Sequence, residues 1–229
     1  MTTIRNNLQQ VHERIAAACA AAQRPVTDVT LVAVSKTCGP ESVREAHGCG
    51  QKGFGENYIQ EAVEKMALLD ELPLQWHCIG PVQSNKTRLV AGHFEWVHTI
   101  DRLKIAQRLS EQRPEHLPAL QVCLQVNIDG GATKAGVAAA DALALARQIS
   151  TLPRLRLRGL MTIPEPVAGF EQQLAVHLRT RALFDQLNAA GAGLDTLSMG
   201  MTADLEAAIH AGSTMVRIGT AIFGDRPRA

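Results

Sequence analysis

The stretch from residue 30 to residue 40 reads TLVAVSKTCGP, and it decides how the rest of the chain is interpreted. Apolar and β-branched residues predict a buried strand over 30–35, and Gly39-Pro40 then breaks the chain. Lys36 stands where this strand ends, although a charged amine is costly to bury. It is either a surface lysine that follows a strand or a reactive amine held at a strand end.

Composition indicates a folded α/β protein with an aliphatic core. The chain has 229 residues, of which 46% are hydrophobic and only 3% aromatic. This length suits one α/β barrel, and we expect a single domain over 1–229 because no linker or composition shift divides the chain. There are 23 Lys and Arg against 22 Asp and Glu, a net charge of +1, so we expect no nucleic-acid partner.

Cysteine spacing and the lack of targeting signals predict a cytoplasmic protein. The five cysteines, at 19, 38, 49, 78 and 123, form no C-x-x-C pair, which favours reduced thiols. We find no signal peptide and no segment that would span a membrane. Cys38 is either a nucleophile near Lys36 or a small side chain that fills space. We expect no metal site.

Hydrophobic periodicity predicts strands and helices in regular alternation. The expected strands are 30–35, 53–55, 74–79, 95–99, 119–127, 155–161, 195–198 and 214–218. The expected helices are 2–22, 41–48, 57–70, 84–91, 101–112, 138–151, 169–190 and 203–211. The strands are too apolar for a sheet with one wet face, as in buried parallel sheets. Eight such units predict a closed (β/α)8 barrel of the TIM type with an extra N-terminal helix; an open doubly wound sheet is the alternative.

In such a barrel the functional residues lie where the strands end. Besides Lys36, that layer should contain residues 55–57 after the second strand, 77–80 after the third and 198–201 after the seventh. Asn127, Met161 and residues 217–220 complete it. Most of these positions are polar or glycine, which is typical of the rim of a pocket.

The segment RIGTAIFG, 217–224, carries the strongest local signal. Gly219 and Thr220 form a turn from a strand into a short helix, and free N–H groups at a helix start attract phosphate. Ser198 and Gly200 would add a hydroxyl and a permissive backbone position. An ordinary turn without a ligand is the alternative. We expect Thr202 to cap helix 203–211 instead of contacting a ligand, with the carboxylates of Asp204 and Glu206 directed outward.

Arg217 ends an apolar run, and inside the barrel its guanidinium would need an acceptor. A pyridine-type nitrogen, a phosphate or an acidic side chain could serve. A lysine, a phosphate-binding turn and an arginine at one barrel mouth suit pyridoxal 5′-phosphate, whose aldehyde forms a Schiff base with an uncharged lysine amine. An enzyme that uses Lys36 on a phosphorylated sugar is the competing hypothesis.

Six motifs spread over nearly the whole chain carry a resemblance to a known family. They are VAVSK (32–36), GFGENYIQE (53–61), WHCIGPVQSNK (76–86), RLRGLM (156–161), LSMGM (197–201) and GSTMVRIGTAIFG (212–224). Together they resemble the pyridoxal phosphate homeostasis proteins, the YggS/PROSC family. That family is a single barrel similar to the N-terminal domain of alanine racemase. The chain departs from the pattern at Met199 and at Thr202-Ala203.

The resemblance implies the residues that bind the cofactor. Lys36 would hold pyridoxal phosphate as a Schiff base, and Arg217 would face the pyridine nitrogen. Ser198, Gly219 and Thr220 would hold the phosphate. The resemblance further implies that Asn57, His77 and Met201 line the cofactor.

The sequence favours a cofactor carrier or buffer over an enzyme. Racemisation needs two bases on opposite faces of the substrate carbon; Lys36 is one, and neither Tyr58, the only tyrosine, nor His77 is an evident second. A weak racemase of the alanine racemase type stays the alternative. We expect a monomer whose partners are pyridoxal phosphate and, as a further hypothesis, enzymes that receive it. Lys86 and Lys134 are expected to be surface lysines, although Lys134 could pass on an aldehyde.

Overall fold

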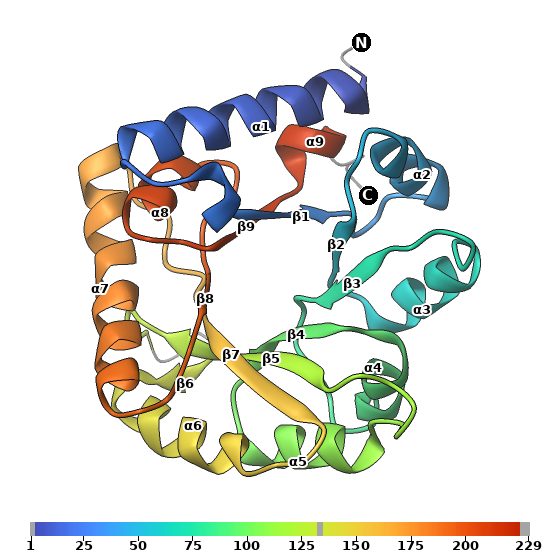
Figure 1. Ribbon diagram of the computed structural model, residues 1–229, viewed down its shortest axis with the longest axis vertical. Coiled ribbons are helices and arrows are strands. Elements are labelled where there is room, and N and C mark those ends of the chain that lie inside the picture. Colours follow the sequence, from blue (N-terminus) through green and yellow to red (C-terminus); the bar gives the residue numbers. More distant parts are fainter. Residues whose placement is uncertain (1–2, 132–134, 225–229) are drawn as a thin grey trace.

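The computed structural model describes residues 3–131 and 135–224, in which parallel strands form a closed ring surrounded by helices (Figure 1). The strands are β1 (Thr30–Val34), β2 (Gly53–Glu56), β3 (Gln75–Cys78), β4 (Trp96–Ile100), β5 (Leu120–Asn127), β6 (Val137–Ala138), β7 (Leu155–Met161), β8 (Thr196–Ser198) and β9 (Met215–Ile218).

Helices follow most of the strands and cover the outside of the ring (Figure 1). They are α1 (Ile4–Ala21), α2 (Pro40–Gly48), α3 (Ile59–Ala67), α4 (Thr87–His93), α5 (Leu103–Gln112), α6 (Ala142–Ser150), α7 (Phe170–Ala189), α8 (Leu205–His210) and α9 (Thr220–Phe223). Two single turns of 3-10 helix, Val26–Asp28 and Ala139–Asp141, precede β1 and α6.

Strand pairing closes the barrel. The strand order is β4-β3-β2-β1-β9-β8-β7-β5, and β4 also pairs with β5, so the sheet returns on itself. In the closing pair, Trp96 lies opposite Gln121 and Val97 opposite Val122. The closed barrel predicted from the sequence is therefore confirmed, and the open doubly wound alternative is excluded because that sheet would keep two free edges.

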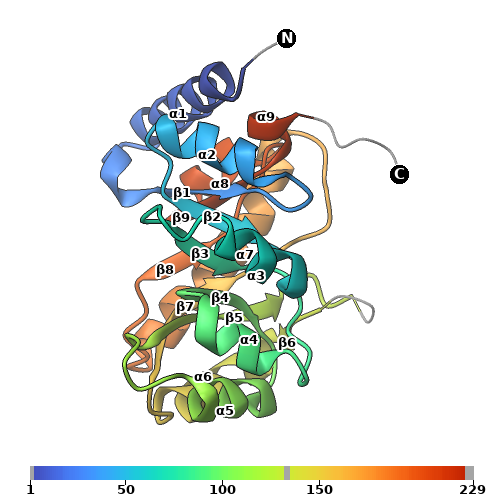
Figure 2. The ribbon, with the colours of Figure 1, turned by 90° about the vertical axis from the view of Figure 1, so that its right-hand side faces the viewer.

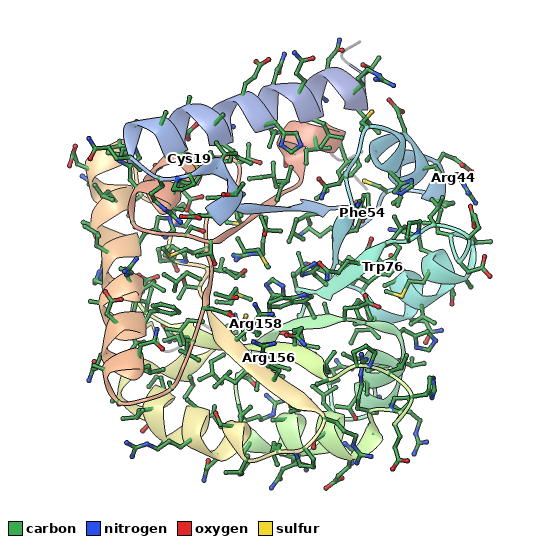
Figure 3. The ribbon with its side chains drawn as sticks, in the orientation of Figure 1. Cys19, Arg44, Phe54, Trp76, Arg156 and Arg158 are labelled. Atoms are coloured by element: carbon green, nitrogen blue, oxygen red, sulfur yellow. The ribbon has the colours of Figure 1, made fainter. Side chains whose placement is uncertain are left out.

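Two apolar regions form the core. The larger one lies between the strands and the helices and includes the rings of Phe54 and Trp76, whose centroids are 5.8 Å apart (Figure 3). The smaller one contains Val32, Trp96, Cys123, Met161 and Met215, each from a different strand. Since successive residues of a strand point to opposite faces, these smaller-core residues occupy the barrel interior.

The bounds of several elements differ from the predicted ones. The short strands near 53–55 and 195–198 are confirmed as β2 and β8. The predicted helix 138–151 is wrong at its start, because Val137–Ala138 pair with the end of β5 as the extra strand β6. Gly136 makes this possible, since a Cβ there would lie 2.7 Å from the backbone nitrogen of Asn127. Lys134 lies outside the described residues.

The extra N-terminal helix is confirmed as α1, which lies along one side of the barrel next to α8 and α9 (Figure 1). Its apolar face buries Leu8, Val11 and Ile15. Arg14 on the polar side pairs with Glu206 of α8 at 2.8 Å. Helix α1 therefore supports the two short helices α8 and α9, and α9 lines the cavity end of the barrel.

Figure 2 shows the barrel from the side, with α9 and β6 near the same end of the strands. All five cysteines are free thiols, as their spacing predicts. In the part of the chain that the structure describes, no helix combines the length and the apolar character needed to cross a bilayer.

Candidate functional site

A cavity of about 370 Å³ opens at the carboxyl ends of the strands, as the barrel prediction requires. Ile163 and Met201, which are 40% and 39% exposed, lie at its rim. Its lining residues are Val34, Lys36, Thr37, Cys38, Asn57, Ile79, Ile163, Met201, Thr202, Ala203, Arg217, Gly219, Thr220, Phe223 and Gly224. The volume is in the range of small-molecule and cofactor sites.

Lys36 lies in this cavity, two residues beyond β1. The backbone around it is fixed: Ser35 N donates to Gly55 O at 3.0 Å, and Cys38 N donates to Ser35 O at 3.0 Å. Thr37 adopts a φ of +67°, which a β-branched residue rarely takes, so the turn directs the chain sharply after Lys36. Lys36 therefore belongs to the lining of the cavity, which favours the hypothesis of a lysine held at a strand end.

Gly219 and Thr220 lie in the same cavity as Lys36, at the start of α9. Gly219 is the N-cap residue, and the first N–H groups of a helix have no acceptor within the helix. A Cβ on Gly219 would lie 3.3 Å from Val34 O, so the glycine lets this turn pack closely on β1. The turn offers backbone donors to an anion, as predicted.

The prediction for Thr202 is wrong. Helix α8 starts at Leu205 and has Asp204 at its N-cap position, so Thr202 lies too early to cap it and lines the cavity instead. Thr202 shares this lining with Gly219 and Thr220, which adds a hydroxyl-bearing side chain to the cavity. Reasoning from the sequence missed this residue because a threonine just before a predicted helix is also a common cap.

Asp204 does not point outward as predicted. One carboxylate oxygen accepts from Met201 N at 2.7 Å, and the other is 2.9 Å from His177 Nε2 of α7. Burial opposes ionisation of Asp204, but the hydrogen bonds from His177 and from the Met201 amide hold its pKa below the ordinary value. Asp204 therefore fixes the loop that carries Met201 and Thr202. Glu206 is turned toward α1, where it binds Arg14.

Arg217 extends from β9 through the barrel interior to the cavity. Its Nη1 donates to Ser198 Oγ at 2.7 Å, and its Nη2 donates to Thr162 O at 3.0 Å. Burial lowers the pKa of its guanidinium to about 10, which still leaves it charged at neutral pH. The expectation that a buried Arg217 needs acceptors is confirmed, and neutral oxygens supply them.

Ser198 and His77 do not line the cavity, contrary to the prediction. Both are fully buried inside the barrel. Ser198 Oγ is 2.8 Å from His98 Nδ1, and His98 Nε2 is 3.0 Å from His77 Nδ1. His77 Nε2 in turn lies 3.2 Å from Gln75 Oε1. These side chains form a continuous chain of hydrogen bonds beneath the cavity.

One arrangement of protons gives every group in that chain a partner. A guanidinium can only donate, so Ser198 Oγ accepts from Arg217, and in this arrangement it gives its own proton to His98 Nδ1. His98 then carries its proton on Nε2 and donates to His77, which donates from Nε2 to Gln75. Burial lowers the pKa of His77 to about 3 and that of His98 well below its usual value, so both rings are neutral. Every bond runs away from Arg217, which holds the guanidinium in place.

Asn57 and Met201 line the cavity as predicted. Asn57 is held close to the next strand by Gly80, where a Cβ would lie 2.2 Å from Asn57 O. Only glycine permits this approach, so residue 80 fixes the backbone of Asn57.

Three other side chains singled out in the sequence have simpler positions. Cys38 lines the cavity, and its thiol lies 3.8 Å from Lys36 O. Lys86 lies at the N-cap position of α4 and donates to Gln60 Oε1 at 3.3 Å, away from the cavity lining. Tyr58 is half exposed at the N-cap position of α3. Among residues 3–131 and 135–224, no group of three or more His, Cys, Asp and Glu side chains is arranged to hold a metal ion.

This geometry places a primary amine, a guanidinium and the turn at the start of α9 around one cavity. An amine can condense with a carbonyl group, and the turn and hydroxyls can bind a phosphate. A ligand that has both groups on a small ring fits the donor set.

Comparisons with known proteins agree with this geometry. The family model for the alanine racemase N-terminal domain matches residues 4–227. The pyridoxal phosphate homeostasis protein of Pseudomonas aeruginosa is 59% identical over 226 residues, which cover 99% of this chain and 97% of the relative. The protein of the same name from Escherichia coli is 51% identical and covers 99% and 98%.

The chain belongs to the pyridoxal phosphate homeostasis protein family. A solved structure with the same fold is PipY of Synechococcus elongatus with PLP bound, at 37% identity and a TM-score of 0.80, covering 93% of this chain and 100% of PipY. An alanine racemase of Clostridium difficile matches at 16% identity with a TM-score of 0.72, covering 99% of this chain but 57% of the racemase. The second match shows a shared fold alone, so membership of the homeostasis protein family rests on the sequence relatives.

Proposed function

We propose that this chain binds pyridoxal 5′-phosphate as a Schiff base on Lys36 and serves as a carrier or buffer in intracellular pyridoxal phosphate homeostasis. The observation that carries the proposal is the single cavity that Lys36 shares with Arg217, Thr202 and the Gly219–Thr220 turn. Relatives that are 48–59% identical bear the homeostasis name, and the PipY structure was solved with PLP bound. Both support the same ligand.

Each part of the ligand has a partner in the cavity. The phosphate binds at the start of α9 and at the hydroxyls of Thr202 and Thr220. Arg217 faces the pyridine nitrogen, and Asn57 and Met201 flank the ring. Ser198 and His77, which were expected to touch the cofactor, act through Arg217 instead, because they are joined to it by hydrogen bonds inside the barrel.

Arg217 also bears on the chemistry. Bound pyridoxal phosphate acts as an electron sink, most strongly when its ring nitrogen is protonated. A guanidinium can only donate a hydrogen bond, so it favours the unprotonated nitrogen and a weaker sink. The hydrogen bonds of Arg217 to Ser198 and Thr162 hold the guanidinium in this position.

We further propose that the protein is not an enzyme. Among the described residues that line the cavity, only Lys36 and Cys38 carry a group that can take a proton as a base near neutral pH. Both come from the same turn after β1, whereas a racemase needs bases on opposite faces of the substrate carbon. The fold shared with alanine racemase does not alter this, because one fold serves many functions.

Reductive trapping tests cofactor binding. Purified protein incubated with pyridoxal phosphate should become yellow, and borohydride should fix the mass of the cofactor on the peptide that contains Lys36. Lys36→Ala should abolish the trapped mass, while Lys86→Ala, a surface lysine away from the cavity, should not change it. A colourless wild-type protein, or label on Lys86 instead of Lys36, would contradict the proposal.

Solvent-deuterium exchange separates carrier from racemase. The loaded protein in deuterium oxide should incorporate no deuterium at the α-carbon of alanine above the rate of free pyridoxal phosphate. Incorporation at enzymatic rates would support the racemase.

The remaining expectations concern partner proteins, subcellular location and oligomeric state. We propose a cytoplasmic monomer that supplies pyridoxal phosphate to apo-enzymes. Stopped-flow transfer from loaded protein to an apo-enzyme, with a trap for free cofactor, tests direct delivery; transfer that the trap abolishes would show release into solution. Light scattering of the loaded protein tests the monomer.

A further inference from the structure

A buried ion pair joins the end of β2 to helix α3, outside the lining of the cavity. Lys65 of α3 and Glu56 of β2 are 9% and 2% exposed, and Lys65 Nζ lies 2.7 Å from Glu56 Oε1. The same carboxylate oxygen accepts from Ser35 Oγ at 2.7 Å. Ser35, Glu56 and Lys65 therefore form one buried cluster, which we call the Ser35–Glu56–Lys65 cluster.

This cluster holds the peptide group that leads into Lys36. Lys65 Nζ donates to Ser35 O at 2.9 Å, and that carbonyl is bonded directly to the backbone nitrogen of Lys36. Side chains of neighbouring residues in extended chain point to opposite sides, so Ser35 faces α3 while Lys36 faces the cavity. The cluster thus fixes the backbone of Lys36 from the side of α3, and none of its side chains lines the cavity.

Energetics argue against a role in stability alone. Taking two charges out of water costs several kcal/mol each, and replacing a buried ion pair by apolar residues is often neutral or stabilising. Hydrogen bonds from a charged amine are, in contrast, short and directional, so they define the position of their acceptors well. Here one acceptor is the carbonyl that precedes Lys36, and the other is a carboxylate that holds the Ser35 side chain.

We propose that Glu56 and Lys65 are positioning residues that hold Lys36 where its amine can condense with an aldehyde. The inference rests on the proposed function and deepens it. The proposed phosphate-binding residues Thr202, Gly219 and Thr220 follow other strands and take no part in the hydrogen bonds of the cluster. The cluster should therefore matter for ligands that react with Lys36 and not for ligands that only occupy the phosphate site.

The test compares two ligands on a variant that leaves no lone buried charge. Glu56→Gln combined with Lys65→Met keeps the side-chain volumes and removes both charges together. We expect its dissociation constant for pyridoxal 5′-phosphate to rise about tenfold, which is about 1.4 kcal/mol, while that for pyridoxine 5′-phosphate changes less than about twofold. Pyridoxine 5′-phosphate has an alcohol in place of the aldehyde, so it cannot form the Schiff base. The melting temperature of the ligand-free protein should stay close to the wild-type value.

Two control variants and one combined variant accompany this measurement. Arg181→Gln with Asp185→Asn removes an exposed ion pair of α7 and should leave both ligands unchanged. Thr202→Ala should weaken both ligands alike, because both carry the phosphate. Adding the double substitution to Lys36→Ala should cause no further loss of pyridoxal phosphate affinity, because the amine that it positions is then absent.

The experiment distinguishes a failure of the positioning role from a failure of the proposed function. Equal losses for the two ligands, or no loss for either, would overturn the positioning role. If the double variant does not fold, Ser35→Ala replaces it: this change removes only the hydroxyl donated to Glu56 and should weaken pyridoxal phosphate alone. A wild-type protein that binds both ligands equally and forms no Schiff base would instead refute the function proposed for Lys36.

Discussion

Thr202 and Ser198 carry hydroxyls four residues apart, but they face different surroundings. Thr202 lines the cavity, while Ser198 is enclosed in the barrel between Arg217 and His98. The sequence identifies the loop but not which of its two hydroxyl-bearing residues lines the cavity. That choice depends on where β8 ends, and β8 is only three residues long.

Thr202→Ala should weaken phosphate binding, and Ser198→Ala should not. Hydrogen bonds to charged groups contribute about 1.5–3 kcal/mol, so we expect Thr202→Ala to raise the dissociation constant for inorganic phosphate about tenfold or more. Thr202→Ser should restore most of the affinity. Calorimetric titration measures both effects; a larger loss in Ser198→Ala than in Thr202→Ala would contradict the arrangement.

His77 should make the stability of the ligand-free protein fall in acid. The unfolded ring has the ordinary pKa of 6.5, whereas burial lowers the pKa of the folded ring to about 3. Between these values the unfolded chain binds more protons, so stability is fully present above pH 6.5 and declines as the pH falls toward 3.

Urea unfolding at several pH values checks this dependence. In His77→Gln the fall in unfolding free energy with acid should be shallower by up to about 1.4 kcal/mol per pH unit, one proton's worth. An unchanged slope in His77→Gln would show that His77 is not held neutral.

Among the elements, α1 has the clearest sequence signal. Its apolar residues recur at helical spacing, and Thr3 caps its start by accepting from Asn6 N at 3.3 Å. The helices α3, α4, α5 and α8 begin two or three residues later than predicted, because the polar residues that precede them fit a loop as well as a first helical turn. Strand β6 escaped prediction, since two residues are too few to show a period.

Ile15→Ala should test the support that α1 gives to the cavity end of the barrel. Ile15 is 2% exposed, and removing such a side chain costs about 2–5 kcal/mol of unfolding free energy. Gln10→Ala, on the exposed side of the same helix, should change it by less than about 0.5 kcal/mol. Urea unfolding of the ligand-free protein measures both, and similar small effects would mean that α1 contributes little to the fold.

For the whole molecule, the alternation of strands and helices is enough to predict a closed barrel. It does not predict which side chains occupy the barrel interior. The interior contains His77, His98, Ser198 and Arg217 beside aliphatic and sulfur-containing residues. Each of these polar side chains is tolerable only because another strand supplies its partner. Such partnerships between residues up to 100 positions apart cannot be read from one sequence.

Gly159 should be essential for the barrel as a whole. A Cβ there would lie 1.6 Å from Thr196 O, so Gly159→Ala would separate β7 from β8. We expect loss of soluble protein or a destabilisation above about 4 kcal/mol. Gly92→Ala in α4, where a Cβ meets nothing within 4 Å, should instead stabilise by up to about 1 kcal/mol. A soluble, stable Gly159→Ala protein would refute the strand pairing.

The fixed backbone around residue 36 has a kinetic consequence. With the preceding carbonyl anchored to α3 and the following residue in a tight turn, the main chain there cannot swing. Any excursion of the terminal amine must come from rotation about its own four methylene bonds, which takes nanoseconds or less. The rates of cofactor binding and release should then be set by formation and cleavage of the bond to Lys36 and by diffusion through the cavity opening. A slow rearrangement of the main chain should not limit them.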